Sequence, residues 1–289
     1  MSGSIKRVGM AGMRMRLRVW VVGLVCGVVP CAWGQGAAGV APIDTTALVR
    51  RAVEHRMDAV KEHKPLRYVV HLKDERHETT KQIVETRDGD VARLVAVSGR
   101  PLTVEEEQAE TARLDALAAN PEQQEHRMRG EAKDEERVDH LLSLLPDGLV
   151  YTMEGVEACA AGECYRLSFA PKPGWQPPDM EANLLRGVTG EVWIAQGVER
   201  LTKLEVHFTG DVDFGLGILG RLNKGGMVEL EQAEVLPGDW ELTRVQVDVT
   251  GRALLVKPLN YQITEELSGF AGVGSMGYRE GIEVLKKGE

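Results

Sequence analysis

Apolar residues recur at the three- and four-residue spacing of an amphipathic helix near the beginning of the chain. Residues 45–64 carry this pattern, with Asp44 or Thr45 placed to cap the first turn and Pro65 placed to end the helix. The apolar stripe consists of Val49, Val53, Met57 and Val60. The pattern therefore predicts one helix that buries a single face.

A second helical region follows further along the chain. Thr103 and Glu106 form a capping box that begins one helix, and Asn120 caps the next. Residues 122–137 of that second helix are almost entirely charged. Its remaining turns have an apolar face made of Val138, Leu141, Leu142 and Leu145. We expect residues 103–145 to form a helical insertion with a solvated, charged surface.

Alternation of apolar and polar residues predicts β-strands in the rest of the chain. Residues 66–72, 81–87 and 91–97 show it before the insertion. From Leu149 onward, strands recur about every ten residues with turns between them. The apolar positions of these strands include Tyr68 and Val70, then Tyr165, Leu167 and Phe169, then Leu204, Val206 and Phe208, and finally Trp240 and Leu242.

The order of these elements predicts the fold class. No helix separates the strands of residues 150–265, which favours antiparallel pairing, and a phase slip near Thr243 predicts a β-bulge. We expect an α+β fold in which a curved antiparallel sheet forms an incomplete β-barrel over helices. Residues 45–265 would form a single domain, and residues 266–289 a C-terminal tail.

The first 34 residues have the order of a secretory signal peptide. A basic stretch ends at Arg18, an apolar run covers residues 20–30, and Ala32 and Gly34 place small side chains at the −3 and −1 positions of a cleavage site. The apolar run is shorter than the ~20 residues of a membrane span. We expect cleavage after Gly34, a linker over residues 35–44, and a periplasmic or secreted mature protein without a transmembrane segment.

The charge balance excludes one class of partner. The 289-residue chain has 35 basic and 44 acidic residues, and its net charge is −9. The leader holds five basic residues and no acidic ones, which leaves 30 basic and 44 acidic residues and a net charge of −14 after cleavage. Such a surface repels phosphate backbones, so we expect no nucleic-acid partner.

Two cysteines remain after cleavage of the leader. Cys159 and Cys164 flank a four-residue turn between two strand-like runs. In an oxidising compartment such a pair closes across a hairpin, whereas two unrelated buried thiols are the alternative. We expect a structural disulfide that stabilises the fold by about 2 kcal/mol.

The motifs of common enzymes are incomplete in this sequence. A GxGxxG pattern begins at Gly215, but both flanks are predicted antiparallel strands rather than the strand and helix of a dinucleotide site. The seven histidines are expected at the surface, because Lys81 stands where an HExxH motif after His77 needs its second histidine. Ser275 misses the GxSxG elbow, since Val273 replaces the first glycine. We therefore expect no enzyme activity, no metal and no cofactor.

One segment resembles a known family. Residues 190–204 read Gly-Glu-Val-Trp-Ile-Ala-Gln-Gly-Val-Glu-Arg-Leu-Thr-Lys-Leu, and residues 167–171 before them read Leu-Ser-Phe-Ala-Pro. The first segment is similar to a hairpin of the LolA/LolB lipoprotein-localisation superfamily, and the second resembles the strand that commonly enters this region. The resemblance covers roughly residues 45–265. It implies an incomplete barrel wrapped over helices, with an apolar cavity that accepts acyl chains.

The resemblance gives the inward strand residues a role. The expected cavity wall consists of Tyr68, Val70, Tyr165, Leu167, Phe169, Leu204, Val206, Phe208, Trp240 and Leu242. The expected gate consists of Trp175, held in a proline-rich loop, and of Leu216, Ile218 and Leu219 between glycines. The alternatives are a filled core and a Trp175 that packs on the nearest strand.

Two functions follow from these alternatives. A cavity predicts a periplasmic carrier of lipid or lipoprotein acyl chains. A filled core predicts an envelope interaction or stress-sensing module that binds a protein partner through its rim.

Overall fold

The computed structural model describes residues 43–214, 220–253 and 257–288, so the expected signal peptide lies outside the described residues. The helices are α1 (Thr45–Glu62), α2 (Val104–Ala118), α3 (Pro121–Gly148), the short 3-10 helix η1 (Ala182–Gly187) and α4 (Tyr278–Lys287). The strands are β1 (Leu66–Asp74), β2 (Glu78–Val84), β3 (Val91–Val97), β4 (Arg100–Pro101), β5 (Leu149–Cys159), β6 (Gly162–Pro171), β7 (Val188–Ala195), β8 (Leu201–Phe208), β9 (Val212–Phe214), β10 (Gly220–Leu222), β11 (Met227–Leu236), β12 (Asp239–Ala253) and β13 (Lys257–Gly272).

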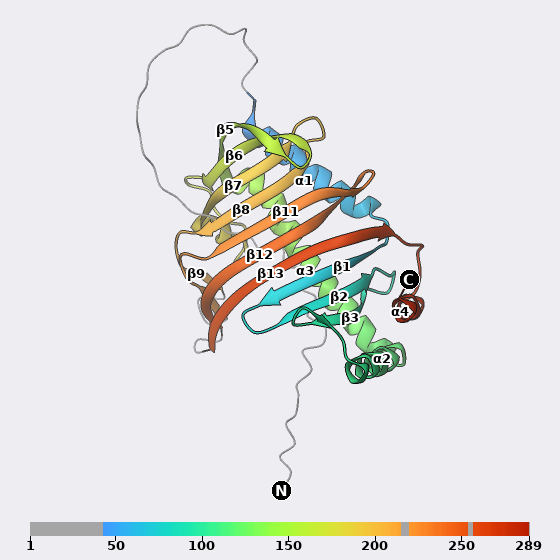
Figure 1. Ribbon diagram of the computed structural model, residues 1–289. Coiled ribbons are helices and arrows are strands. Elements are labelled where there is room, and N and C mark those ends of the chain that lie inside the picture. Colours follow the sequence, from blue (N-terminus) through green and yellow to red (C-terminus); the bar gives the residue numbers. More distant parts are fainter. Residues whose placement is uncertain (1–42, 215–219, 254–256, 289) are drawn as a thin grey trace, which may run out of the picture.

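The strands form one twisted antiparallel sheet (Figure 1). Their order is β4–β3–β2–β1–β13–β12–β11–β8–β7–β6–β5, with β10 paired to β12 and β9 paired to β10. Strands β4 and β5 form the two edges and do not pair with each other, so the sheet is not closed into a barrel. The predicted α+β class and the antiparallel sheet over helices are confirmed.

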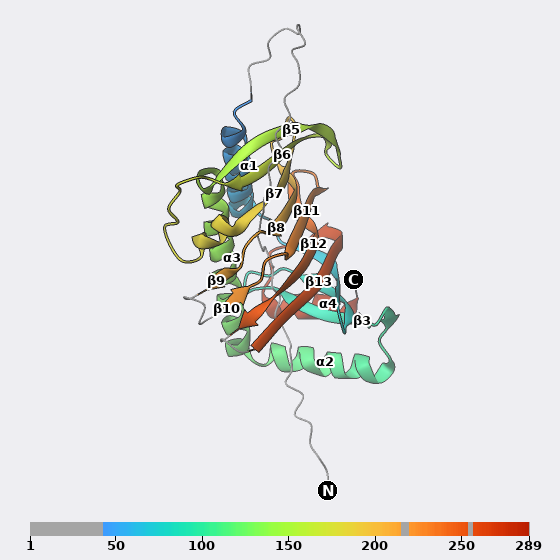
Figure 2. The same ribbon diagram turned by 90° about the vertical axis from the view of Figure 1, so that its left-hand side faces the viewer.

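Helices α1 and α3 lie on the same face of this sheet (Figures 1 and 2). Asp44 caps α1 by accepting a hydrogen bond from the Ala47 amide at 2.9 Å, as one of the two predicted caps requires. The two helices and the strands from β5 to β12 bury one large apolar cluster. From the helices it receives Leu48, Val49, Ala52, Val53, Val138, Leu142 and Leu145.

A smaller core lies at the other end of the sheet, where the sequence predicts a C-terminal tail. Residues 266–288 instead contain the end of β13 and helix α4, whose Ile282 is fully buried against β2, β3 and α2. A Cβ atom at Gly281 would lie 2.9 Å from a methyl group of Val91. The glycine therefore lets α4 approach the sheet closely, and this helix is part of the fold.

The predicted bulge is present in β12. Glu231 of β11 pairs with Arg244, whereas Gln232 pairs with Leu242, so Thr243 is the extra residue. The bulge shifts the alternation by one position and allows Leu242 and Val245 to face the same core.

Candidate functional site

Two small apolar gaps lie between α1 and the inner face of the sheet. The first has a volume of about 10 Å³ and is lined by Val49, Ala52, Val53, Leu145, Leu149, Tyr151, Phe169, Val192, Ile194, Leu201 and Leu204. The second has a volume of about 30 Å³ and is lined by Ala52, Val53, Arg56, Leu142, Leu201, Leu230, Gln232 and Leu242. Ala52, Val53 and Leu201 line both, so we call the two gaps together the α1 seam. Each gap has room for only one or a few waters, so the side chains beneath α1 nearly fill the interior.

The structure brings most of the expected cavity residues to this region. Phe169 and Leu204 line the first gap, and Leu242 lines the second. The other members that belong to the same core cluster do not line a gap. They are Leu167, Val206 and Phe208, which are buried, and Tyr165, which packs against the cluster.

Three expected cavity residues lie elsewhere. Tyr68 and Val70 belong to a separate cluster, in which the rings of Tyr68 and Phe270 stack with their centroids 5.3 Å apart. Trp240 packs against the cluster around Cys164. Alternation along a strand predicts which side chains share a face, but it does not predict which helix covers that part of the face.

The structure describes only one of the four residues of the expected gate. Trp175 packs against the main core. A Cβ atom added at Gly148 would lie 3.1 Å from its ring. It lines neither gap of the α1 seam. Leu216, Ile218 and Leu219 lie outside the described residues.

A larger and more polar groove opens beside the seam. It has a volume of about 580 Å³ and lies between the end of α1, helix α3 and the β11–β12 hairpin. We call it the α1 groove. Its lining residues are Arg56, Ala59, Val60, Glu62, His63, Lys64, Glu135, Arg200, Pro237, Gly238, Asp239, Trp240 and Glu241. Arg56 lines both the groove and the second gap, so the polar space and the apolar one adjoin at this residue.

His63 holds the end of α1 at the wall of this groove. Its Nε2 atom lies 2.5 Å from a carboxylate oxygen of Glu85, and its Nδ1 atom lies 3.2 Å from one of Glu241. Glu85 is buried and also accepts a hydrogen bond from the Leu66 amide at 3.0 Å. The hydrogen bonds to Glu241 and Glu85 raise the pKa of His63 to about 10. The ring is therefore a cation that joins the end of α1 to the residue after β2 and to β12, and His63 is exposed at the surface as the sequence predicts.

Further contacts hold α1 along its length. Arg51 forms a bidentate pair with Glu199 at 2.6 and 2.9 Å, and Arg200 donates a hydrogen bond to the His55 carbonyl at 2.5 Å. These two contacts join the helix to the turn between β7 and β8. At the other end, the Thr45 hydroxyl donates to the Tyr151 carbonyl at 3.1 Å.

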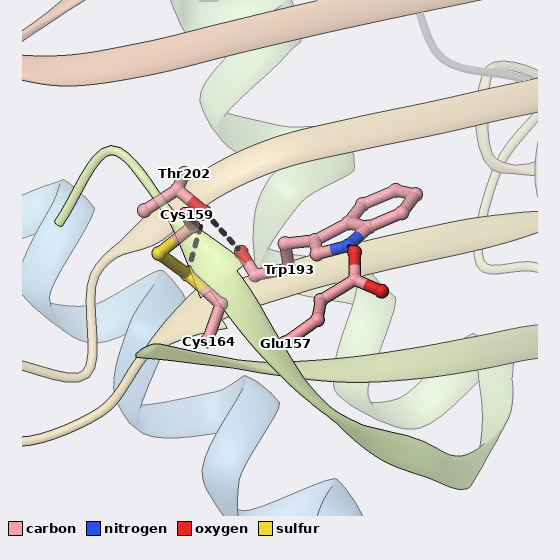
Figure 3. The surroundings of a disulfide bond; sticks show 5 residues. All are labelled: Glu157, Cys159, Cys164, Trp193 and Thr202. Atoms are coloured by element: carbon pink, nitrogen blue, oxygen red, sulfur yellow. Dashed lines mark hydrogen bonds between the residues drawn. A yellow bond between two sulfur atoms is a disulfide. The ribbon is translucent and has the colours of Figure 1, made fainter. Parts of the chain in front are cut away.

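The predicted disulfide joins Cys159 to Cys164 across the β5–β6 hairpin (Figure 3). Cys164 is fully buried and lies 3.2 Å from the Thr202 hydroxyl. Trp193 belongs to the same cluster, and its indole donates a hydrogen bond to Glu157. The neighbours of Trp193 along β7, Val192 and Ile194, belong to the main core, so the Trp193 side chain lies on the opposite face of the sheet from that core.

The described residues contain neither a metal-binding cluster nor a membrane-spanning helix. In residues 43–214, 220–253 and 257–288, no three or more His, Cys, Asp or Glu side chains are arranged to hold a metal ion. No helix within the same ranges combines the length and the apolar character needed to cross a membrane.

Comparison with known proteins finds only distant similarity. No protein-family model and no curated protein matches the chain. A DUF1329 family protein from Desulfovibrio piger is 10% identical with a TM-score of 0.31, and the match covers 81% of this chain and 96% of that one. A LolA superfamily protein from Nitrosomonas europaea is 8% identical with a TM-score of 0.30, covering 84% and 97%. An outer-membrane lipoprotein-sorting protein domain from Vibrio parahaemolyticus is 10% identical with a TM-score of 0.24, covering 82% and 99%.

The Nitrosomonas structure is named as a member of the superfamily that residues 190–204 resemble, and the Vibrio structure is named as a lipoprotein-sorting domain. The likeness is distant in sequence and in superposition, so it carries no conclusion about activity. The fold class rests on the strand order and on the position of the helices described above.

Proposed function

We propose that this chain is a non-enzymatic, exported carrier that binds lipid or lipoprotein acyl chains between α1 and the inner face of the sheet. The observation that carries the proposal is the α1 seam, where two neighbouring gaps share a lining of apolar side chains. On the α1 side this lining is made mainly of small residues, Val49, Ala52 and Val53, which leave space that larger side chains would fill.

An acyl chain has to displace α1 in order to enter, because the gaps are far smaller than such a chain. An outward movement exposes the buried side chains of α1, which are Leu48, Val49, Ala52 and Val53, and the three larger ones cost about 1.5–3 kcal/mol each. A chain that buries ten CH₂ groups gains about 8 kcal/mol. The two quantities are of the same order, so an acyl chain can replace the apolar contacts of α1 without a large net loss.

The direct test is native mass spectrometry of the protein purified from its own cell envelope. A carrier co-purifies with a lipid or an acylated peptide, which adds a defined mass. A clean mass of the protein alone, together with no binding of a fluorescent fatty acid, would reject the proposal.

Two substitutions in the seam act in opposite directions. Ala52→Leu fills both gaps and is expected to weaken binding of a fluorescent fatty acid, whereas Val53→Ala enlarges them and is expected to strengthen it. Ala112→Leu makes the same chemical change on an exposed face of α2 and controls for the added apolar surface. Thermal unfolding of each variant separates a loss of binding from a loss of folding.

The small volume of the gaps favours a second candidate, an interaction module of the envelope with a filled core. Its partner would be a protein that binds the rim of the sheet. In the same experiment this candidate gives no lipid and a co-purifying protein, and neither substitution in the seam changes partner binding.

A further inference from the structure

The α1 groove lies at the end of the α1 seam, and Arg56 lines both. The groove has a volume of about 580 Å³, within the ~300–1,000 Å³ range of small-molecule sites. The seam is apolar, whereas the groove is lined largely by charged side chains. A ligand that extends through both would need an apolar chain and a polar head.

The charges of the groove are balanced in an otherwise acidic protein. Its cationic side chains are Arg56, His63, Lys64 and Arg200, and its carboxylates are Glu62, Glu135, Asp239 and Glu241. Residues 35–289 as a whole carry a net charge of −14. Four cations beside four carboxylates therefore distinguish the groove from the average surface, which repels anions.

The cations and the two hairpin carboxylates come from different elements, whereas Glu62 lies on α1 beside the cations and Glu135 lies on α3. Arg56 and Lys64 belong to α1 and the residues after it, and Arg200 comes from the turn before β8. Asp239 and Glu241 lie on the β11–β12 hairpin and flank Trp240, a partly buried residue that also lines the groove. An indole flanked by carboxylates favours an ammonium group, and guanidinium groups favour phosphate or carboxylate.

We propose that the α1 groove binds the zwitterionic head group of an amphiphile, with its anionic group at Arg56, Lys64 and Arg200 and its ammonium group at Trp240 and Asp239. The acyl chain of the same ligand passes Arg56 into the α1 seam. This inference rests on the proposed function, because it places the polar end of the ligand whose chain the seam accepts.

The experiment is isothermal titration of the full exported chain with four probes below their micellar concentrations. Three share one acyl chain and differ in the head: lysophosphatidylethanolamine is zwitterionic, lysophosphatidylglycerol is anionic, and a monoacylglycerol is neutral. The fourth is glycerophosphoethanolamine, the zwitterionic head without a chain. We expect the zwitterionic lysolipid to bind about tenfold tighter than either lysophosphatidylglycerol or the monoacylglycerol, and the chainless head to bind weakest.

Substitutions assign the preference to the groove. Lys64→Gln and Asp239→Asn are each expected to reduce the affinity for the zwitterionic lysolipid three- to tenfold and to leave monoacylglycerol binding unchanged. Lys133→Gln removes an exposed lysine of α3 that does not line the groove, and it should change neither affinity.

The possible outcomes separate the two proposals. If no acyl probe binds, the carrier proposal and the head-group site both fail. Equal binding of the three lysolipid-type probes, or tightest binding of the anionic one, overturns the head-group site and leaves the carrier intact. Binding of the chainless head as tightly as the lysolipid would mean that the groove takes a soluble zwitterion and that the ligand does not extend into the seam.

Discussion

Replacing His63 by glutamine should destabilise the protein in a strongly pH-dependent way. The imidazolium of His63 lies between the carboxylates of Glu85 and Glu241, and the side chains of the three residues are 29%, 8% and 22% exposed. Glutamine keeps a hydrogen-bonding side chain of similar length but removes the charge. Glu85 then remains buried with the Leu66 amide as a donor but without the adjacent cation.

The size of the effect follows from the pKa of His63, which the two carboxylates raise from 6.5 to about 10. A pKa change of one unit corresponds to about 1.4 kcal/mol, so the upper limit is about 5 kcal/mol. The ring is partly exposed, and solvent screening reduces the attraction. We therefore expect His63→Gln to lower the free energy of unfolding by about 2–3 kcal/mol near pH 6, close to the ~3–5 kcal/mol for breaking a fully buried pair.

The direction of the pH dependence follows from the raised pKa. The stabilisation is fully present below pH 6.5, where the unfolded chain is also protonated, and is lost as the pH rises toward about 10. Urea unfolding of the native chain and of His63→Gln at pH 6, 8 and 10 should give curves that converge with rising pH. His77→Gln, at a 70% exposed histidine beside Asp74, is the matched control. A constant difference in the free energy of unfolding between the native chain and His63→Gln at all three pH values would refute the charged contact of His63 with Glu85 and Glu241.

Three further predictions concern stability and processing. Replacing Cys159 and Cys164 together by serine should lower the free energy of unfolding by about 2 kcal/mol, and adding reductant to the native protein should reproduce this loss in denaturant titrations. Gly190→Ala should destabilise the protein by about 3 kcal/mol or more, because its Cβ atom would lie 1.9 Å from a backbone carbonyl of β8. Gly130→Ala, in open space on α3, should stabilise it by about 0.5–1 kcal/mol. Equal shifts of the melting temperature for the two variants would contradict the close packing of β7 at Gly190. Intact mass of the exported protein should correspond to a chain that begins at Gln35, and retention of the leader would disprove the signal peptide.

Local patterns in the sequence predicted the elements that depend on local chemistry. The capping box of Thr103 and Glu106 forms as expected, with hydrogen bonds in both directions. Glu106 also accepts from Arg100, and these bonds lower the pKa of its carboxyl to about 2. The bulge at Thr243 and the disulfide of the β5–β6 hairpin depend on a few neighbouring residues, which is why spacing alone revealed them.

The parts that were missed depend on residues far apart in the sequence. Arg56, Arg200 and Asp239 come from three separate elements, and each is an ordinary surface charge when considered in its own segment. His63 differs from the other surface histidines because Glu85, just after β2, and Glu241 of β12 both approach its ring. Likewise, the pattern around Tyr68 shows an inward face but gives no sign that Phe270 covers it. A groove assembled in this way has no signature along the chain.

The pairing of β1 with β13 has a consequence for how the chain is made. In the described sheet, β1 to β4 join the remaining strands through β13 alone, with Leu66 opposite Gly272. Roughly 180 residues separate these two strands, and synthesis at ~5–20 residues per second takes on the order of 10 s or more to supply them. During that interval the early hairpin has an unpaired edge at β1, which is a template for aggregation. Production of this protein should therefore depend on keeping β1 to β4 from pairing with other chains until β13 has been synthesised. A truncation that removes β13 should be insoluble rather than merely less stable.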